Sequence, residues 1–259
     1  MSLTRSLAAL AAFCALTATS QAGTIVVPDL PEVSGVNTGI RNAPRTYMAL
    51  YTDVNFASLS GPVQITGMQL RISAAGNAAL PANWPSQVLS FANFDVKLSQ
   101  ASDDLLADGE FLSSSVSFAS QQAPGTVVNV RSGALSLPMA SFQNSGGENT
   151  FGAVINFTTP YLYTPGESLL LYITHTGYTP SSEAQPFFAV SDFENGVADA
   201  IASTAGYNAT NASGFSSPYI VQFTYSVTAV PEPSTMLMLS LGMAGLLAAT
   251  RRRRTSDVA

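Results

Sequence analysis

Cysteine, histidine, tryptophan and charged side chains are all scarce in this sequence of 259 residues. It contains one cysteine, one histidine and one tryptophan, and charged residues make up 10% of it. The cysteine, Cys14, lies in an apolar stretch near the N-terminus, and no cysteine follows it. The rest of the chain therefore has neither a disulfide framework nor a thiol nucleophile, and its fold must depend on packing.

The only histidine, His175, excludes a metal site built from several imidazoles. It follows the apolar stretch Leu169 to Thr174, where a hydrogen-bonded histidine at a strand end is the simplest role. A catalytic triad would need a nucleophile and an acid that converge on this imidazole, and the spacing indicates neither. Gly-x-Ser-x-Gly, His-Glu-x-x-His and phosphate-binding glycine motifs are also missing from the sequence. We therefore expect no enzyme activity and no bound cofactor or metal, with a hydrolase that uses a dispersed acidic site as an alternative.

The few charges are strongly segregated along the chain. Of ten basic residues, Arg5 lies at the N-terminus and Arg251 to Arg254 lie at the C-terminus, which leaves five between them. Between Gly23 and Ala229 these five face fourteen acidic residues, a formal charge of −9. A surface of this sign repels phosphate backbones, so nucleic acid is excluded as an expected partner.

The first 22 residues have the order of a secretory signal. Arg5 precedes an apolar stretch from Leu7 to Leu16, and small residues stand before Gly23 in the sequence Ser-Gln-Ala. Signal peptidase admits small side chains at these positions, which predicts a signal helix within residues 1–22 and cleavage between Ala22 and Gly23. Export by the Sec machinery and signal peptidase as a processing partner follow from this prediction.

Alternation of apolar and polar residues is the main structural signal after the lead. Met68, Leu70 and Ile72 alternate with polar neighbours, which predicts a half-buried strand. The longest such pattern runs from Tyr219 to Thr228. Other expected strands, each bounded by turn residues, are Thr46 to Tyr51, Phe94 to Ser99, Phe111 to Phe118, Thr126 to Val130, Phe151 to Phe157, Ser168 to Thr174 and Pro186 to Val190.

About nine strands without a convincing helical period between them cannot build parallel βαβ units. The sequence therefore predicts an all-β fold, an antiparallel β-sandwich of jelly-roll type, over residues 45–229. Residues 23–44 read as a loop-like lead, in which Thr24 to Val27 is either a first edge strand or part of a flexible segment. Ser168 to Thr174 is apolar on both faces, so we expect it at the centre of a sheet. Ala101 to Gly109 and Ser191 to Ala205 have weaker patterns and favour a short helix or long loops.

Two groups in this domain are candidates for binding. Four acidic residues between Asp103 and Glu110 suggest calcium, but their spacing does not fit the twelve-residue calcium loop, and Asp108-Gly109 also reads as a turn. Trp84 is the leading candidate for stacking on a sugar ring, although loop aromatics more often cover the ends of a core. The other aromatic residues considered for a sugar site are Tyr161, Tyr163, Tyr178 and Tyr207.

The C-terminal tail, residues 230–259, has three parts in a fixed order. Pro231 and Pro233 remove two backbone donors and hold Glu232 in an extended and exposed segment. The apolar run at 236–249 would be about 21 Å long as a helix, short of a hydrocarbon core of about 30 Å. With residues 234–250 and snorkelling arginines it predicts a single, marginal transmembrane helix. The basic end, Arg251, Arg252, Arg253 and Arg254, should stay in the cytoplasm and leave the β domain outside.

This three-part tail resembles the PEP-CTERM sorting signal, with the motif at Pro231, Glu232 and Pro233. The resemblance implies recognition by an exosortase, a membrane transpeptidase of Gram-negative bacteria that make extracellular polysaccharide. It also implies transient anchoring in the inner membrane, removal of the tail, and delivery of the β domain to the cell envelope or outside. Carried over by position, Pro231, Glu232 and Pro233 are the recognition residues.

These observations predict a surface-destined protein with a structural or adhesive role in an extracellular polysaccharide matrix. A carbohydrate-binding module that uses loop aromatics is an alternative from a second class. Ice binding is disfavoured, because the domain has only an isolated Thr174-His175-Thr176 in place of a regular threonine array.

Overall fold

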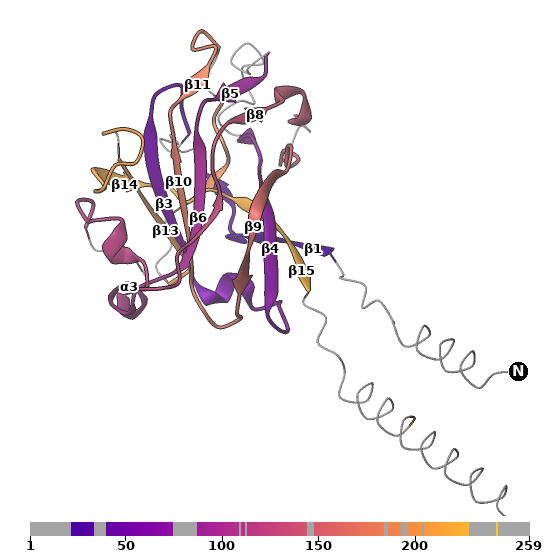
Figure 1. Ribbon diagram of the computed structural model, residues 1–259, viewed down its shortest axis with the longest axis vertical. Coiled ribbons are helices and arrows are strands. Elements are labelled where there is room, and N and C mark those ends of the chain that lie inside the picture. Colours follow the sequence, from indigo (N-terminus) through magenta and orange to yellow (C-terminus); the bar gives the residue numbers. More distant parts are fainter. Residues whose placement is uncertain are drawn as a thin grey trace, which may run out of the picture. The chain divides into compact units, whose positions relative to one another are not determined.

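The computed structural model describes residues 22–33, 40–74, 87–108, 110–111, 113–143, 148–183, 186–192, 196–203, 205–227 and 242. The chain divides into a compact unit, Ala22–Val227, and a second unit formed by Met1–Gln21 with Thr228–Ala259. All the strands belong to the first unit, and two antiparallel sheets dominate it (Figure 1). The expected signal helix and C-terminal helix lie outside the described residues. In the part of the chain that is described, no helix is both long and apolar enough to cross a membrane.

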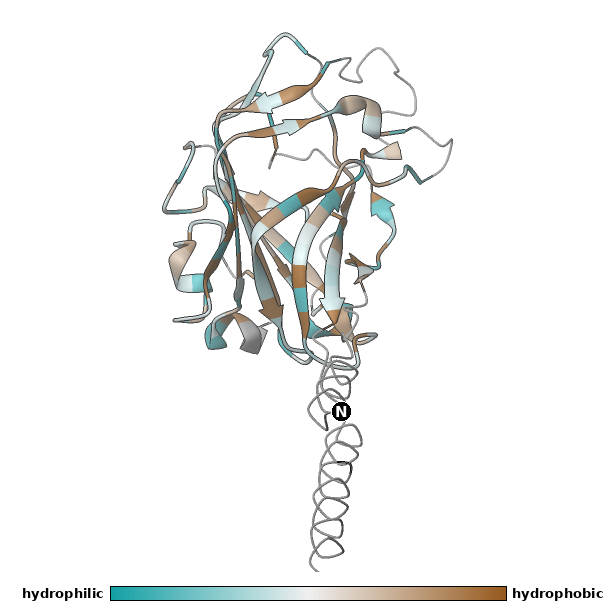
Figure 2. Ribbon diagram, turned by 45° about the vertical axis from the view of Figure 1, so that its right-hand side comes forward, coloured by the Kyte–Doolittle hydropathy of each residue, from teal (hydrophilic) through white to brown (hydrophobic). Residues whose placement is uncertain are grey.

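A four-stranded sheet contains the first and the last strand of the chain. Its order is β1-β15-β4-β9, and every neighbouring pair is antiparallel. The strands are β1 (Ala22–Val27), β4 (Val63–Leu70), β9 (Ile155–Tyr163) and β15 (Val221–Val227). Their alternating sequences bury one face of the sheet and leave threonine, serine and glutamine side chains on the other. The alternation is visible as bands of different hydropathy along the strands (Figure 2).

A six-stranded sheet forms the second layer, in the order β14-β13-β3-β10-β6-β7. Its strands are β3 (Arg45–Tyr51), β6 (Phe94–Gln100), β7 (Val128–Arg131), β10 (Leu169–His175), β13 (Ala198–Ser203) and β14 (Gly214–Ser216). β10 is buried along its whole length and pairs with β3 on one side and β6 on the other. This confirms the central position that the two apolar faces of this segment predict.

Shorter elements close the ends of the two layers. A three-stranded sheet has the order β11-β5-β8, and β12 pairs with β2. The short strands are β2 (Glu32–Val33), β5 (Leu89–Phe91), β8 (Leu135–Leu137), β11 (Tyr178–Thr179) and β12 (Val190–Ser191). The described helical turns are η1 (Asp53–Phe56), α3 (Asp103–Asp108), η3 (Ala119–Gln121) and η4 (Met139–Ser141).

The main core lies between the inner faces of the two large sheets. Tyr51 of β3 and Phe223 of β15 meet edge to face, with ring centroids 6.3 Å apart. The Tyr51 hydroxyl donates a hydrogen bond of 2.8 Å to the carbonyl oxygen of Tyr219, so this buried polar group has a partner within the core. Contacts of this kind join the two sheets into one sandwich, as the alternating pattern predicts.

A second apolar cluster covers the outer face of the six-stranded sheet. Leu50, Leu170 and Ile201 point away from the main core and pack with Leu105 of α3 and with Phe111. Because this outer face is also apolar, β3, β10 and β13 are buried on both sides. The cluster therefore holds α3 and the segment that follows it against the sheet.

Two expectations about individual segments change with the structure. Phe111 to Phe118 is not a strand, because Phe111 and Phe118 both fold onto the second cluster and only Ser117 forms an isolated bridge, with Asn211. The segment Ser191 to Ala205, expected as a helix or loop, contains the buried strand β13. Small alanine side chains at alternate positions fill the space between the layers there, and they give little periodic signal. The sequence suggested mainly loop between Gly23 and Pro44, with Thr24 to Val27 as either an edge strand or part of a flexible segment. The structure has an edge strand there, β1.

Candidate functional site

The two ends of the β unit meet at one end of the four-stranded sheet. β1 and β15 are antiparallel neighbours, with Ala22 opposite Ser226 and Val27 opposite Val221 (Figure 1). The expected signal cleavage between Ala22 and Gly23 therefore lies beside the last residues of β15. Because β15 ends at Val227, only residues 228–230 separate it from Pro231. We call this end of the sheet the terminal end, and the end at Leu70 of β4 the distal end.

Gly23 is held against an aromatic ring on the neighbouring strand. A Cβ atom added to Gly23 would lie 2.6 Å from Cζ and the hydroxyl oxygen of Tyr225, its cross-strand partner. Any side chain at this position would have to displace the ring, so glycine permits the close approach. The predicted cleavage would thus expose a new N-terminus that begins within β1 on a residue already packed under Tyr225.

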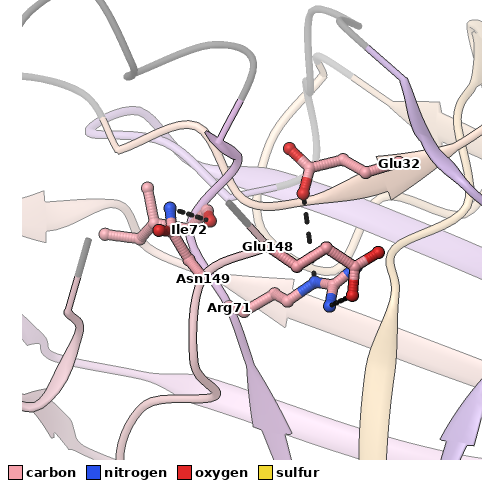
Figure 3. A network of polar contacts seen from close by, with 5 residues as sticks. All are labelled: Glu32, Arg71, Ile72, Glu148 and Asn149. Atoms are coloured by element: carbon pink, nitrogen blue, oxygen red, sulfur yellow. Dashed lines mark hydrogen bonds and ion pairs between the residues drawn. The ribbon is translucent and has the colours of Figure 1, made fainter. Parts of the chain in front are cut away.

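A buried ionic cluster marks the distal end (Figure 3). Arg71, directly after β4, is 6% exposed, and its Nη1 donates to Oε2 of Glu148 over 2.9 Å. Its Nε lies 3.9 Å from Oε2 of Glu32 in β2, and the guanidinium stands over the ring of Phe151 at 5.5 Å from the centroid. The Glu32 side chain is 7% exposed and that of Glu148 is 68% exposed. The figure shows the guanidinium between the two carboxylates.

This cluster joins separate segments of the chain at the distal end. Next to it, buried Asn149 donates to the carbonyl oxygen of Ile72 over 2.8 Å. Both carboxylates lie against the same guanidinium, which offsets one of their two negative charges and fixes β2 and the segment at Glu148 against β4. Carboxylates held in this way act as ion-pair partners, and the sequence patterns had not singled them out.

His175 has the structural role that its position at a strand end predicts. It is completely buried at the end of β10, and its Nδ1 accepts a hydrogen bond of 3.0 Å from the backbone N–H of Gly177. The rings of Phe91 and Phe94 lie 5.2 and 5.9 Å from the imidazole, measured between centroids. The imidazole is thus enclosed by aromatic side chains and has no exposed surface at which a substrate could meet it.

The acidic segment from Asp103 to Glu110 forms a short helix where calcium was considered. Asp103 and Asp104 occupy the first turn of α3, where carboxylates interact favourably with the helix dipole, and both are exposed. Among the described residues no group of three or more histidine, cysteine, aspartate or glutamate side chains could hold a metal ion. Asp103 and Asp104 are thus placed at the N-terminal end of α3 and in contact with solvent.

The aromatic residues considered for a sugar site differ in their exposure. Tyr161 and Tyr163 lie in β9 and Tyr178 in β11, and all three are buried, so they are core residues and not a glycan surface. Tyr207 is partly exposed, and its hydroxyl donates to a carboxylate oxygen of Asp95. Trp84 lies outside the described residues, within the range 75–86.

Asp199 is a buried carboxylate that the sequence analysis did not single out. It is 3% exposed in β13, and its two oxygens accept hydrogen bonds from the backbone N–H groups of Phe111 (2.7 Å) and Ala200 (2.6 Å). Burial raises the pKa of this carboxyl to about 6, an effect to which Glu110 adds and which the two backbone hydrogen bonds oppose. The bond to Phe111 fastens the segment after α3 to the sheet. Protonation of Asp199 therefore changes a contact that holds the second cluster in place.

We expect the stability of the domain to depend on pH through Asp199. The pKa in the folded state, about 6, lies above 3.8, the ordinary value for an aspartate in an unfolded chain, so the folded protein binds this proton more tightly. The free energy of unfolding should therefore rise as the pH falls from 7 to 4, by up to about 3 kcal/mol from this group. Urea unfolding at several pH values measures the effect. Asp199→Asn should remove it, whereas the exposed control Asp104→Asn should not; equal slopes in both variants would contradict this assignment.

The comparisons with known proteins concern the C-terminal tail. Pro231, Glu232, Pro233 and Arg251 to Arg254 lie outside the described residues, so their roles remain predictions from the sequence. No curated protein matches the chain. Residues 229–254 match the family model of the PEP-CTERM protein-sorting motif, the signal that the sequence of the tail indicates. The chain thus carries a PEP-CTERM sorting motif directly after a β-sandwich unit, which makes it an exported protein targeted to an exosortase.

Proposed function

We propose that this protein is a non-enzymatic component of an extracellular polysaccharide matrix, with a structural or adhesive role. The observation that carries the proposal is the PEP-CTERM motif at residues 229–254, placed directly after the last strand of a β-sandwich. The tail holds the precursor in the inner membrane and is removed after the exosortase recognises Pro231 to Pro233. Signal peptidase acts at Ala22-Gly23, and the processed domain reaches the cell envelope or the outside.

The arrangement of the sandwich supports this route. Both ends of the β unit lie at the terminal end, so one signal at each end can hold the unit against the same membrane. The Arg71 cluster lies at the opposite, distal end of the sheet. One cavity has a volume of about 270 Å³ and is lined by residues that include Leu50, Thr52, Asp53 and Leu105. Among the described residues that line it, only Asp53 is ionisable. Two cooperating carboxylates of a hydrolase are not brought together there.

Retention by the matrix tests the proposed role. Producing cells should release the processed chain into the extracellular polysaccharide fraction, and washing the matrix with salt should leave most of it bound. Purified protein added to matrix from cells that lack the gene should be retained as well. Free passage through that matrix would contradict the structural or adhesive role, while hydrolysis of the polysaccharide would favour an enzyme. Retention that Trp84→Ala abolishes would favour the carbohydrate-binding alternative.

A further inference from the structure

The free edge of β1 differs from the other three edges of the two large sheets. Sheets usually protect an edge by shortness, proline, charge or an irregular register. β14 is short, with three residues. β9 contains Pro160 and lies against β7. β7 carries Arg131, and its pairing with β6 has a register shift. β1 has six residues with regular pairing to β15, no charge and no proline. Its outer edge is thus a ready template for another strand.

An open groove runs beside this edge. It has a volume of about 500 Å³ and is lined on one side by Thr24, Ile25 and Val26 of β1. On the other side lie η1 and the residues after it, including Val54, whose side chain is 55% exposed. An extended segment that paired with β1 would occupy this groove and cover Val54.

The strand that suits this edge is β1 itself. An added strand must place apolar side chains on the core side and polar ones on the outer side, in register with Ile25 and Thr24. β1 meets this requirement at three positions, since Ile25 and Val27 point inward and Thr24 points outward, while Val26 adds one apolar side chain to the outer side. We propose that two copies of this chain associate through their β1 edges, which pair antiparallel across a two-fold axis and join two four-stranded sheets into one.

The distribution of charge favours a second copy in this position. The unit carries a formal charge of −9 between Gly23 and Ala229, which opposes self-association over most of its surface. The four strands β1, β4, β9 and β15 contain no charged residue, so the two sheets meet without repulsion between their strands. Among the described residues, Asp29 is the one charged residue that lines the groove. Signal cleavage gives each β1 an α-ammonium group at Gly23. In an antiparallel pair, this group of the partner lies toward Asp29.

Loss of the tail sets the time of this association, a step that rests on the proposed function. Cleavage at Gly23 leaves residues 23–27 of β1, so an antiparallel β1 pair places the two terminal ends about 17 Å apart along the strands. Residues 228–230 let each Pro231 lie at most about 14 Å from its own Val227. Two copies anchored in one membrane meet this constraint only when both paired strands lie flat along it, so we expect release of the tails to permit the pair.

Engineered cysteines test the pairing directly, because cleavage of the signal leaves the chain without cysteine. Thr24→Cys, Val26→Cys and an equal mixture of the two are oxidised mildly. At least one of the three should give disulfide-linked dimers of the released chain, because a two-fold antiparallel pair brings position 24 or 26 opposite its own copy, or brings the two positions opposite each other. Gln222→Cys is the matched control, because Gln222 lies opposite Val26 on the same face but one strand away from the edge. The precursor in lipid nanodiscs should not cross-link. Equal cross-linking of precursor and released chain would overturn the dependence on release, and absence of cross-linking in all three samples would overturn the pairing.

A charge on the edge gives a second measurement. Thr24→Lys should convert the released chain from dimer to monomer in light scattering, since a lysine on an edge strand opposes strand addition. Leu162→Lys, at an exposed site on the opposite edge strand β9, should leave the dimer intact. The same measurements on residues 22–227, which contain both hydrophobic clusters, do not depend on processing. A monomeric unit there would overturn the β1 interface and leave sorting and matrix retention unaffected, so the two failures can be distinguished.

Discussion

Replacing Arg71 by alanine is expected to lower the free energy of unfolding by about 3–5 kcal/mol, the usual cost of removing one partner from a buried ion pair. The change leaves the carboxylate of Glu32, 7% exposed, without the guanidinium that faces it. It also removes the cation–π contact with Phe151 and the packing of the arginine stem. Urea unfolding of the released chain, followed by circular dichroism, measures the loss.

Two further variants show whether this cost comes from the buried charge. Glu148→Gln should cost less than about 1 kcal/mol, because the Glu148 side chain is 68% exposed and its pair with Arg71 is screened by water. Combining Glu32→Gln with Arg71→Met should recover much of the stability lost in Arg71→Ala, since neither charge then remains in the buried site. If Arg71→Ala were as mild as Glu148→Gln, the cluster would not be an energetic link between β2 and β4.

The sequence predicted the sheets well where burial has a regular period. Met68 and Leu70 of β4 alternate with polar residues, and Leu169 to Thr174 is apolar on both faces, so one strand was expected to be half-buried and the other to lie at the centre of a sheet. Both positions agree with the structure. Periodicity carried this information because the side chains on each face of a strand meet a uniform environment.

The sequence failed where long-range packing decides the structure. Phe111 to Phe118 was expected as a strand because turn residues bound it, but the side chains of Phe111 and Phe118 cover the second cluster on the outer face of the six-stranded sheet. Ala198, Ala200 and Ala202 are small because they face the main core, and small residues produce little hydrophobic signal. Local patterns do not contain the position of the opposite layer, so these segments needed the folded structure.

The candidate sites also divide into those that a local sequence pattern reveals and those that only the folded structure brings together. The sorting motif is local and was found from its order of proline, apolar residues and arginine. The Arg71 cluster joins positions 32, 71 and 148, and Asp199 bonds to Phe111, so neither group forms a sequence motif. A signal for Asp199 did exist, namely an aspartate inside an Ala-Ile segment, where a carboxylate needs hydrogen-bond donors.

The PEP-CTERM tail leads to the second large effect, the loss of processing when Pro231 to Pro233 are deleted. We expect the precursor to accumulate in the membrane fraction with its C-terminus intact, because the exosortase would lack its recognition residues. Mass spectrometry of the C-terminus and fractionation of the cells measure the outcome. The domain itself should be unaffected, since its last strand ends at Val227.

The control for this deletion is a double substitution of Ser234 and Thr235 by alanine, which alters the neighbouring positions and keeps Pro231, Glu232 and Pro233. Processing should continue in the control, and the urea midpoints of both variants should equal that of the unaltered protein. Deletion of residues 228–230 tests whether the sandwich limits access of the exosortase to the motif. β15, which pairs with β1 on one side and with β4 on the other, would then run directly into Pro231. Since a membrane enzyme needs access to an extended segment, we expect this shortened chain to be processed more slowly with its motif complete. Normal processing of the chain without Pro231 to Pro233 would show that the exosortase reads another part of the tail.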